Sequence, residues 1–240
     1  MSAPAAPSGD ELMAVALSRR LRDGWTGIVG AASMVPIAAV LMAQRSHAPK
    51  LHWICSGTGF VDPRPEILFP SSTQYEYRAG ATAVLPYHEV ATLFERGFDF
   101  GFFGGLEIDG AARANTVESG SGRPGPGPAG LPVGMSRTRN VLLYTGRHSP
   151  RALVETVRHR TGVPRGNVRA IVTPLAEFEP GDGDGGRATL AALLGGELDE
   201  VREQTGFDFD ASDPVTRLTP TADELALLRE VDADGRLRSR

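Results

Sequence analysis

The residue types that could do chemistry gather in one stretch, where a short apolar run at 52–55 is followed by Ser56, Gly57 and Gly59. The run has the length of a buried strand, and the glycines behind it indicate a tight turn. Glycine lets a backbone turn sharply and lets a ligand come close to it. Ligands of open α/β sheets bind beyond such carboxyl ends of strands. The stretch is therefore either a ligand-binding turn or a core strand with an ordinary turn.

Two nucleophilic side chains, Cys55 and Ser56, stand at the end of this run. A serine hydroxyl needs a base beside it to attack. His52 is a poor candidate, because four residues along a strand separate it from Ser56 by about 13 Å. Cysteine is among the most buried residue types, so core packing is the simpler interpretation of Cys55. Ser56 is either a nucleophile with an unidentified base or a residue that fills space.

A basic turn follows the predicted strand at 140–144 and contains Arg147, His148 and Arg151. Arginine binds phosphate and carboxylate groups bidentately, so this turn is a candidate anion site. A solvated helix start is the alternative interpretation. No two of the five histidines have the spacing of metal ligands, and a single cysteine cannot form a cysteine cluster. We therefore expect no metal site.

The elements that position these residues alternate between strand and helix, as in an open α/β sheet flanked by helices. Residues 120–134 are dominated by Gly and Pro and predict a long loop, which is either functional or a flexible surface segment. We expect a disordered N-terminus at 1–9, with a single domain from 10 to 240. Strands are predicted at 26–29, 52–55, 98–103, 140–144 and 168–172, and helices at about 10–24, 34–44, 87–96, 150–159, 198–204 and 222–231. Residues 63–86 are predicted to be loop and irregular strand, and residues 180–186 a hairpin-like turn or mobile tip.

The composition is that of an ordinary globular protein, with 240 residues, 41% hydrophobic and 22% charged. A net charge of −4 gives no electrostatic support for binding nucleic acid or anionic membranes. The longest apolar run, residues 34–43, is too short to span a bilayer. One cysteine excludes an internal disulfide and fits a reducing cytoplasm, where we expect the protein to work.

Several stretches, in this order and at these spacings, resemble the B (β) subunit of family I CoA-transferases of the glutaconate CoA-transferase type. The resemblance implies a CoA-transferase-like α/β fold and a heterodimer or heterotetramer with a similar A subunit. It also implies an acyl-CoA thioester as substrate, with no bound cofactor. The stretches that carry it are 48–49, 52–62, 98–109 with Gly-Gly-Leu-Glu-Ile-Asp, 125–130, 147–151, 168–173, 204–209, 219–225 and 228–232.

The sequence departs from this family at its nucleophile. Family members commonly use a B-subunit glutamate, in a Glu-Ser-Gly or Glu-Asn-Gly pattern, after the strand that corresponds to residues 52–55. Here Ser56 takes that position, and no glutamate is nearer than Glu66. A serine cannot form the acyl anhydride and the glutamyl-CoA thioester on which CoA transfer depends. The resemblance thus makes Ser56 a catalytic candidate without the usual chemistry.

The family's Gly-Ser-Gly-Gly-Ala loop departs as well, because two prolines interrupt it at 126 and 128. Each proline removes a backbone donor, so the N–H groups of Gly127, Ala129 and Gly130 are left to bind an oxyanion or CoA. Asp109 and Asn115 lie in a region where structural turn roles are expected. The resemblance implies substrate or CoA binding at Gly57, Gly59, Gly105, Gly127, Ala129, Gly130, His148 and Arg151.

Three functions stay open at this point. Relatives that lack the B-subunit glutamate include the ring-opening hydrolases of steroid degradation, whose catalytic glutamate comes from the A subunit. That precedent favours hydrolysis, C–C cleavage or a related step on an acyl-CoA. Genuine CoA transfer between acids is the second possibility. The third is a non-catalytic partner that completes the pocket of an A subunit.

Overall fold

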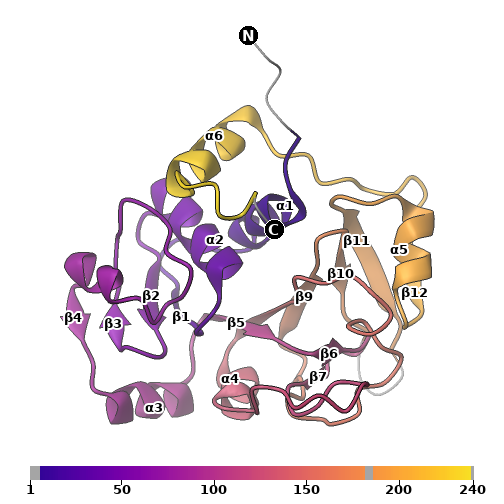
Figure 1. Cartoon of the computed structure of the whole chain (residues 1–240), viewed down its shortest axis with the longest axis horizontal. Coiled ribbons are helices and arrows are strands. Elements are labelled where there is room, and N and C mark those ends of the chain that lie inside the picture. Colours follow the sequence, from indigo (N-terminus) through magenta and orange to yellow (C-terminus); the bar gives the residue numbers. More distant parts are fainter. Residues whose placement is uncertain (1–5, 182–185, 239–240) are drawn as a thin grey trace.

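The computed structural model describes residues 6–181 and 186–238, and its centre is a ten-stranded mixed sheet (Figure 1). The five strands in the middle run parallel, and an antiparallel pairing follows on either side of them. This confirms the predicted open α/β sheet. The strands, in their order across the sheet, are β12 (Phe209–Ala211), β11 (Ala188–Leu193), β10 (Ala176–Glu179), β9 (Val168–Val172), β8 (Asn140–Tyr144), β5 (Phe100–Gly104), β1 (Thr26–Val29), β2 (His52–Cys55), β3 (Phe60–Val61) and β4 (Ala83–Val84).

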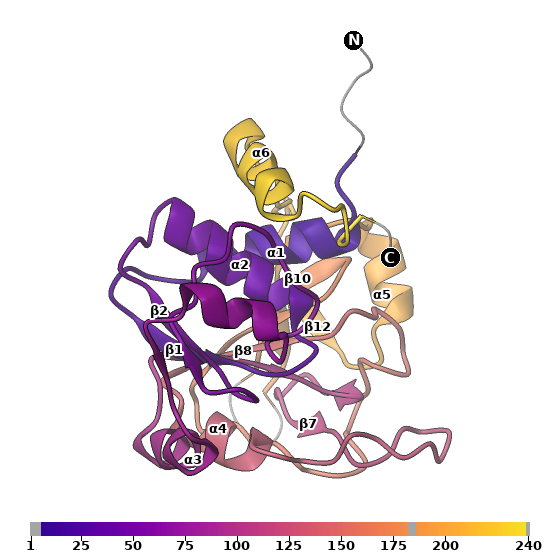
Figure 2. The same ribbon diagram turned by 60° about the vertical axis from the view of Figure 1, so that its left-hand side comes forward.

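Helices cover both faces of the sheet, as the turned view shows (Figure 2). One face carries α1 (Gly9–Arg19), α2 (Met34–Arg45) and α6 (Ala222–Val231), which pack on one another. The other face carries α3 (Tyr87–Arg96) and α4 (Leu131–Arg137). The remaining short elements are α5 (Leu198–Gln204), a 3-10 helix, η1 (Tyr75–Gly80), and a two-stranded sheet of β6 (Glu107–Ile108) and β7 (Ala114–Asn115).

Side chains alternate between these two layers along the central strands. In β1, Ile28 packs with the α3 side chains, whereas Val29 joins the core beneath α1 and α2. In β2, Ile54 likewise packs on the α3 side, and Cys55 joins the core beneath α1 and α2. Strands that are buried on both faces read as continuous apolar runs, which is why the sequence revealed them clearly.

The first helix begins at Gly9, earlier than the start that Asp10 predicted. Ser8 is its N-cap and forms a capping box with Glu11, and the Ser8 hydroxyl also donates to the carbonyl of Leu237 at 2.9 Å. A serine that satisfies N-terminal N–H groups in this way stabilises a helix start. The predicted cap at Thr221 of α6 is confirmed, because Thr221 and Glu224 form the same reciprocal pair.

The predicted helix at 150–159 is wrong, because these residues form turns. Their backbone N–H groups donate across to β6 and the residue after it instead of bonding within the segment. Val154 donates to the carbonyl of Ile108 at 3.0 Å, and Arg158 donates to the Glu107 carboxylate at 3.0 Å. These partners are distant in sequence, so helical periodicity alone could not identify them.

Two loop predictions need smaller corrections. The Gly- and Pro-rich stretch at 120–134 ends in the first residues of α4, whose early Pro132 costs no hydrogen bond at that position. The stretch at 63–86 contains the short strand β4, which agrees with the predicted irregular strand, and also η1, which was not predicted. Of the turn predicted at 180–186, residues 182–185 lie outside the described residues.

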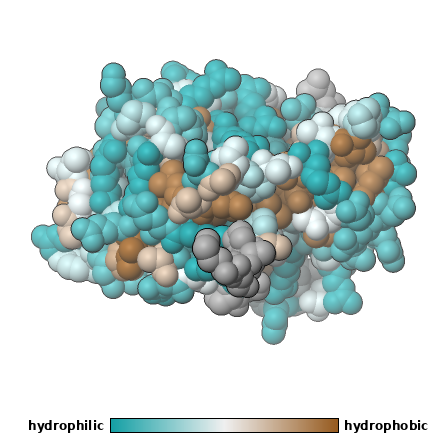
Figure 3. Space-filling model, turned by 90° about the horizontal axis from the view of Figure 1, so that it is seen from above, coloured by the Kyte–Doolittle hydropathy of each residue, from teal (hydrophilic) through white to brown (hydrophobic). Residues whose placement is uncertain are grey.

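Seen from the side of α6, the surface is largely hydrophilic, with a band of hydrophobic residues across its middle (Figure 3). Three large hydrophobic side chains elsewhere are exposed close to β3 and the edge strand β4. Tyr75 is 64% exposed, Val84 is 53% exposed and Tyr87 is 77% exposed. No helix within 6–181 or 186–238 is long and apolar enough to cross a bilayer.

Candidate functional site

The carboxyl ends of β2, β1, β5 and β8 lie along one edge of the sheet, because these four strands are parallel neighbours. The chain runs from β1 to β2 on one side and later places β5 and β8 on the other. The order of the strands therefore reverses between β1 and β5. Ligands of open α/β sheets bind at such a switch point. We call this edge, with the turns after the four strands, the carboxyl-end crevice.

The turn after β2 holds Ser56 at this edge. The Ser56 N–H donates to the carbonyl of Val29 at 3.0 Å, and the Gly59 N–H donates to the carbonyl of Cys55 at 2.9 Å. Gly59 has a φ of +70°, and a Cβ on it would lie 1.9 Å from the Leu85 carbonyl oxygen. The turn itself thus requires glycine at position 59, whether or not a ligand binds there.

The two nucleophile candidates differ in environment. The Cys55 side chain is fully buried, and burial raises the pKa of its thiol to about 12, against the opposing effect of a hydrogen bond with Thr58. A thiol with that pKa stays protonated and unreactive at neutral pH. Ser56 is partly exposed, and its hydroxyl has no hydrogen-bond partner among the described residues. Within residues 6–181 and 186–238, neither side chain has a hydrogen bond to the adjacent base that a nucleophile needs.

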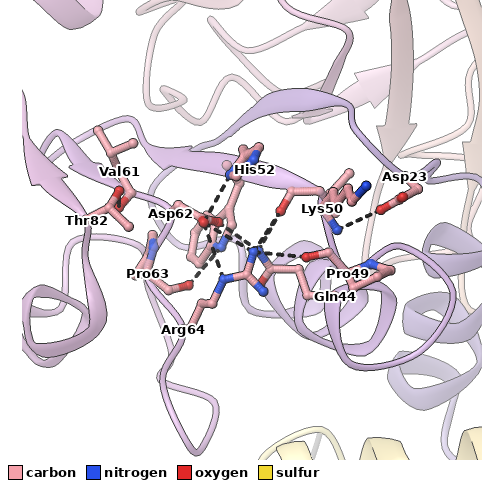
Figure 4. A network of polar contacts seen from close by, with 12 residues as sticks. Asp23, Gln44, Pro49, Lys50, His52, Val61, Asp62, Pro63, Arg64 and Thr82 are labelled. Atoms are coloured by element: carbon pink, nitrogen blue, oxygen red, sulfur yellow. Dashed lines mark hydrogen bonds and ion pairs between the residues drawn. The ribbon is translucent and has the colours of Figure 1, made fainter.

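His52 lies at the other end of β2, as expected, and takes part in a separate polar network (Figure 4). Its Nδ1 atom lies 3.0 Å from Oδ2 of Asp62. The same carboxylate accepts hydrogen bonds from Gln44 at 2.9 Å and from Arg64 at 3.2 and 3.3 Å. The network joins the amino end of β2 to the residue that follows β3, so His52 has a structural partner away from Ser56.

A segment before η1 links the turns after β1 and β2. The Thr58 hydroxyl donates to the carbonyl of Ser72 at 3.2 Å, and the Ser72 hydroxyl donates to the carbonyl of Gly30 at 2.8 Å. The backbone N–H of Ala32 donates to the Ser71 hydroxyl at 3.0 Å. These bonds fix the two turns relative to each other at the carboxyl-end crevice.

Sequence reasoning missed a pair of hydroxyl groups at this edge. The Tyr144 hydroxyl, at the end of β8, lies 3.0 Å from the Ser33 hydroxyl, at the start of α2. Burial raises the pKa of Tyr144, although the bond with Ser33 opposes the rise. Tyr144 reads as the last residue of an apolar strand, and Ser33 as a helix cap. Neither residue belongs to a recognisable sequence motif. The order of the strands in the sheet is what brings their hydroxyl groups together.

The basic turn after β8 is only partly an anion site. His148 lies between two threonines, with Nδ1 2.7 Å from the Thr173 hydroxyl and Nε2 3.0 Å from the Thr205 hydroxyl. Burial lowers the pKa of His148 to about 4, so its ring is neutral at physiological pH. Its two hydroxyl partners give it a packing role in this structure. Arg147 and Arg151 are exposed and stay candidate ligands for a phosphate or carboxylate.

Two further predicted site glycines are explained by close packing. A Cβ on Gly105, just after β5, would lie 2.8 Å from the Glu107 carbonyl oxygen. A Cβ on Gly57 would lie 2.8 Å from the Thr73 side chain. Both residues stand at the expected edge of the sheet. Because close packing already accounts for glycine at these positions, a role in substrate binding stays a prediction.

The Gly- and Pro-rich loop is hydrogen-bonded to the residues that follow β7. The N–H of Gly127 donates to the carbonyl of Thr116 at 3.0 Å, so this N–H is not free to bind an oxyanion as expected. The N–H groups of Ala129 and Gly130 have no backbone partner among the described residues. No backbone hydrogen bond between described residues joins this loop to the turn at Ser56. Asp109 and Asn115 have the structural turn roles expected of them, because each accepts backbone N–H bonds nearby.

The whole chain has known relatives, although no family profile matches it. It is 30% identical to a chain of the decarboxylase AibA/AibB, over 98% of both chains, with a TM-score of 0.86. It is also 27% identical to the B subunit of 3-oxoadipate CoA-transferase from Pseudomonas knackmussii, over 94% of each. The chain belongs to the family I CoA-transferases, as a B-type subunit.

The fold of the B-type subunit agrees with this assignment. Glutaconate CoA-transferase from Acidaminococcus fermentans has the same fold, with a TM-score of 0.82 over 96% of both chains at 21% identity. Further solved structures of AibA/AibB carry a single cysteine replaced by asparagine, valine, serine or alanine. The residues described in this B-type subunit contain no group of three or more His, Cys, Asp or Glu side chains that could hold a metal ion.

Proposed function

We propose that this B-type subunit forms one half of a heteromeric enzyme that acts on an acyl-CoA thioester by C–C cleavage or hydrolysis, and not by CoA transfer. The observation that carries the proposal is the absence of a carboxylate at the carboxyl end of β2. If the family's Glu-Ser-Gly pattern is aligned on its Ser-Gly pair, Cys55 takes the place of the glutamate. If it is aligned on the end of the strand, Ser56 takes that place. Neither residue can form a glutamyl-CoA thioester.

Among these reactions we favour cleavage of a carboxyl group from the acyl chain. The similarity to AibA/AibB, a decarboxylase, supports this choice. When the carboxylate is β to the thioester carbonyl, or linked to it through a C=C bond, the C–C bond to it can break so that CO2 leaves and the electron pair moves into the thioester carbonyl. The resulting enolate then takes up a proton at carbon. This reaction needs hydrogen-bond donors at the enolate oxygen and does not need a nucleophilic carboxylate.

The proposed A subunit would cover the exposed hydrophobic side chains beside the turn after β2. Phe60 of β3 pairs with Val84 of β4, and the Phe60 ring lies 6.1 Å from the ring of Tyr75. Val84 and Tyr75 are themselves exposed. Exposed hydrophobic side chains that lie together mark interaction surfaces, and this group adjoins the carboxyl-end crevice. A partner seated there would close the crevice, and we place the assembly in the cytoplasm.

A second candidate is a B-type subunit that only lends a wall to the pocket of the A subunit. The unpartnered hydroxyl of Ser56 and the buried thiol of Cys55 favour it, because neither of these described residues is activated. In that case alanine at Ser56, His148 or Arg151 would change KM modestly and leave kcat nearly untouched. A loss of kcat by orders of magnitude at any one of them would reject this candidate.

The reaction products of the reconstituted complex test the proposal. The subunit would be co-expressed with a candidate A-type subunit from the same organism and incubated with a dicarboxylic enoyl-CoA, with and without acetate as acceptor acid. We expect CO2 and a shortened acyl-CoA, or free CoA if the reaction is hydrolysis, at rates that do not depend on acetate. Formation of acetyl-CoA at the expense of the substrate would contradict the proposal.

A gain-of-function variant provides the matched control. Ser56→Glu and Cys55→Glu each restore a carboxylate at one of the two aligned positions. If the scaffold still supports transfer, one of these variants should form acetyl-CoA where the parent complex forms none. Ser136→Ala, which removes a partly exposed hydroxyl that donates to the carbonyl of Val133 in the same helix, should behave as the parent does.

A further inference from the structure

We propose that the Tyr144 hydroxyl donates a hydrogen bond to the thioester oxygen of the bound acyl-CoA, and that Ser33 positions it. This inference rests on the proposed function, because it assigns a donor at the site proposed to bind the thioester. It does not depend on the choice between C–C cleavage and hydrolysis. In both reactions negative charge develops on the same oxygen.

The pair spans the point at which ligands of α/β sheets bind. Tyr144 ends β8 and pairs with Gly104 of β5, while Ser33 begins α2 directly after β1. Because β5 lies between β8 and β1, the 3.0 Å contact between the two hydroxyls crosses the carboxyl end of β5. This is the switch point between β1 and β5. Ser33 is buried and Tyr144 is half-buried, and the pair stands at the edge of the sheet where the acyl group is proposed to bind.

Glycines leave room beside this pair. A Cβ on Gly30, after β1, would have the Ser33 hydroxyl as its only neighbour, at 3.5 Å. For a Cβ on Gly104 the three nearest atoms would all belong to Tyr144, the nearest at 3.7 Å. A Cβ would therefore fit at both positions without a clash, yet both hold glycine with φ outside the left-handed region. Glycine at such places lets a ligand come close to the backbone.

The hydrogen-bond count explains how Tyr144 becomes available. The Ser33 hydroxyl has one proton, and it has two partners: the carbonyl of Ala31 at 3.1 Å and the hydroxyl of Tyr144. Without a ligand, Ser33 donates to Ala31 and accepts from Tyr144. When an acyl oxygen arrives, rotation of the Ser33 proton toward the Tyr144 oxygen frees the phenol proton for the ligand. Each hydroxyl then polarises the next, which strengthens the donor.

The surroundings favour a negative oxygen and a protonated phenol. Helix α2 begins at this edge, and its N-terminal end carries a partial positive charge. Its first turn contains no acidic residue that would cancel this charge. The raised pKa of Tyr144 keeps the phenol protonated at neutral pH, so it remains a donor. In C–C cleavage, the electron pair of the breaking bond moves to the thioester oxygen, which this donor stabilises. In hydrolysis, the same oxygen gains charge when water adds to the carbonyl carbon.

Tyr144→Phe and Ser33→Ala in the reconstituted complex test the inference with the acyl-CoA that it turns over. Loss of one oxyanion donor lowers kcat by about 100- to 1,000-fold, so we expect a loss of that size in Tyr144→Phe with KM little changed. Ser33 acts only through Tyr144, so Ser33→Ala should lower kcat by about tenfold in the parent and not at all in Tyr144→Phe. If Ser33 had a structural role alone, Ser33→Ala would lower kcat by a similar factor in the parent and in Tyr144→Phe.

Controls separate the outcomes. Ser136→Ala should leave kcat, KM and the melting temperature unchanged, and thermal melts of the other variants check that each complex stays folded at the assay temperature. If Tyr144→Phe does not assemble, Gly30→Ala tests the same crevice, because its methyl group fits the folded chain and should raise KM at least tenfold. Turnover at the parent kcat in Tyr144→Phe, or an unchanged KM in Gly30→Ala, would overturn the inference alone. A complex that turned over no CoA thioester would overturn the proposed function and this inference with it.

Discussion

The Oδ1 atom of Asp62 accepts a hydrogen bond from Nε2 of Gln44 at 2.9 Å, which joins α2 to the residue that follows β3. Asp62 is only 4% exposed and has a φ of +47°, a conformation that aspartate tolerates better than alanine does. Asp62→Ala would leave the buried Gln44 amide without this acceptor and add backbone strain. We expect it to lower the free energy of unfolding by about 3 kcal/mol, measured by urea denaturation.

The control for this variant is Asp210→Ala. Asp210 is exposed and forms an ion pair with the exposed Arg187, at 3.3 Å. Surface ion pairs contribute little, so we expect a change below about 0.5 kcal/mol. If the two variants were equally stable, the Asp62 network would not hold the start of β2 in place.

Gly59→Ala and Gly24→Ala form a matched pair of variants. Comparing their stabilities separates the cost of a positive φ from the cost of a steric clash of the added Cβ. Both glycines have positive φ, +70° and +75°, but a Cβ on Gly24 would have no neighbour within 4 Å. We expect Gly24→Ala to cost about 1 kcal/mol. Gly59→Ala should cost several kcal/mol more and disrupt the turn at Ser56, because its Cβ would overlap the Leu85 carbonyl. Thermal melts of the two variants check the difference, and equal melting temperatures would contradict it.

The Cys55 thiol should resist alkylation in the folded protein. Its pKa of about 12 leaves almost no thiolate at pH 8, and the side chain is fully buried. After treatment with iodoacetamide, peptide mass spectrometry should find Cys55 unmodified in the native complex and fully modified in urea. Because it is the single cysteine of this chain, the assignment is unambiguous. Rapid modification of the native chain would mean that the carboxyl end of β2 is more accessible than the structure indicates.

His148 should make stability depend on pH below neutrality. Its pKa is lowered by burial to about 4 in the folded chain, against about 6.5 in the unfolded chain. The unfolded state therefore takes up the proton first as the pH falls. The stability contribution is fully present above pH 6.5 and is lost between pH 6.5 and about 4, by an amount on the order of 3 kcal/mol. His148→Gln, which keeps hydrogen-bonding groups but does not titrate there, should show a smaller loss over this range.

The sequence predicted the centre of the fold because its strands are buried on both faces. The strands β1, β2, β8 and β9 and the helices α2, α3 and α6 all appear close to their predicted bounds. The strands β10, β11 and β12 were missed. In β11, exposed and buried residues alternate imperfectly, and a register shift between Glu177 and Phe178 in β10 interrupts their pairing. Short irregular strands of this kind are stabilised by their neighbours more than by their own pattern.

The sequence predicted one part of the candidate site, the turn at Ser56, and did not predict the other part, the pair of Tyr144 and Ser33. Ser56 and its glycines were found because a strand, a turn and a family pattern coincide there. Tyr144 and Ser33 are 111 residues apart in the chain. They meet because β5 enters the sheet between β8 and β1, which no local pattern encodes. The prediction that the N–H of Gly127 is free was wrong, because this N–H donates to the carbonyl of Thr116. Thr116 directly follows β7 of the small sheet, and no local pattern predicts this contact.

The most direct test of the central claim is chemical trapping on this chain. The reconstituted complex would be incubated with its acyl-CoA substrate and treated with borohydride, which reduces a glutamyl-CoA thioester to an alcohol that mass spectrometry detects. The absence of a nucleophilic carboxylate after β2 predicts turnover with no reduced glutamate on this chain, whereas Ser56→Glu or Cys55→Glu would show one if the scaffold supports transfer. A reduced glutamate at any position of the unmodified chain would contradict the claim that it does not transfer CoA.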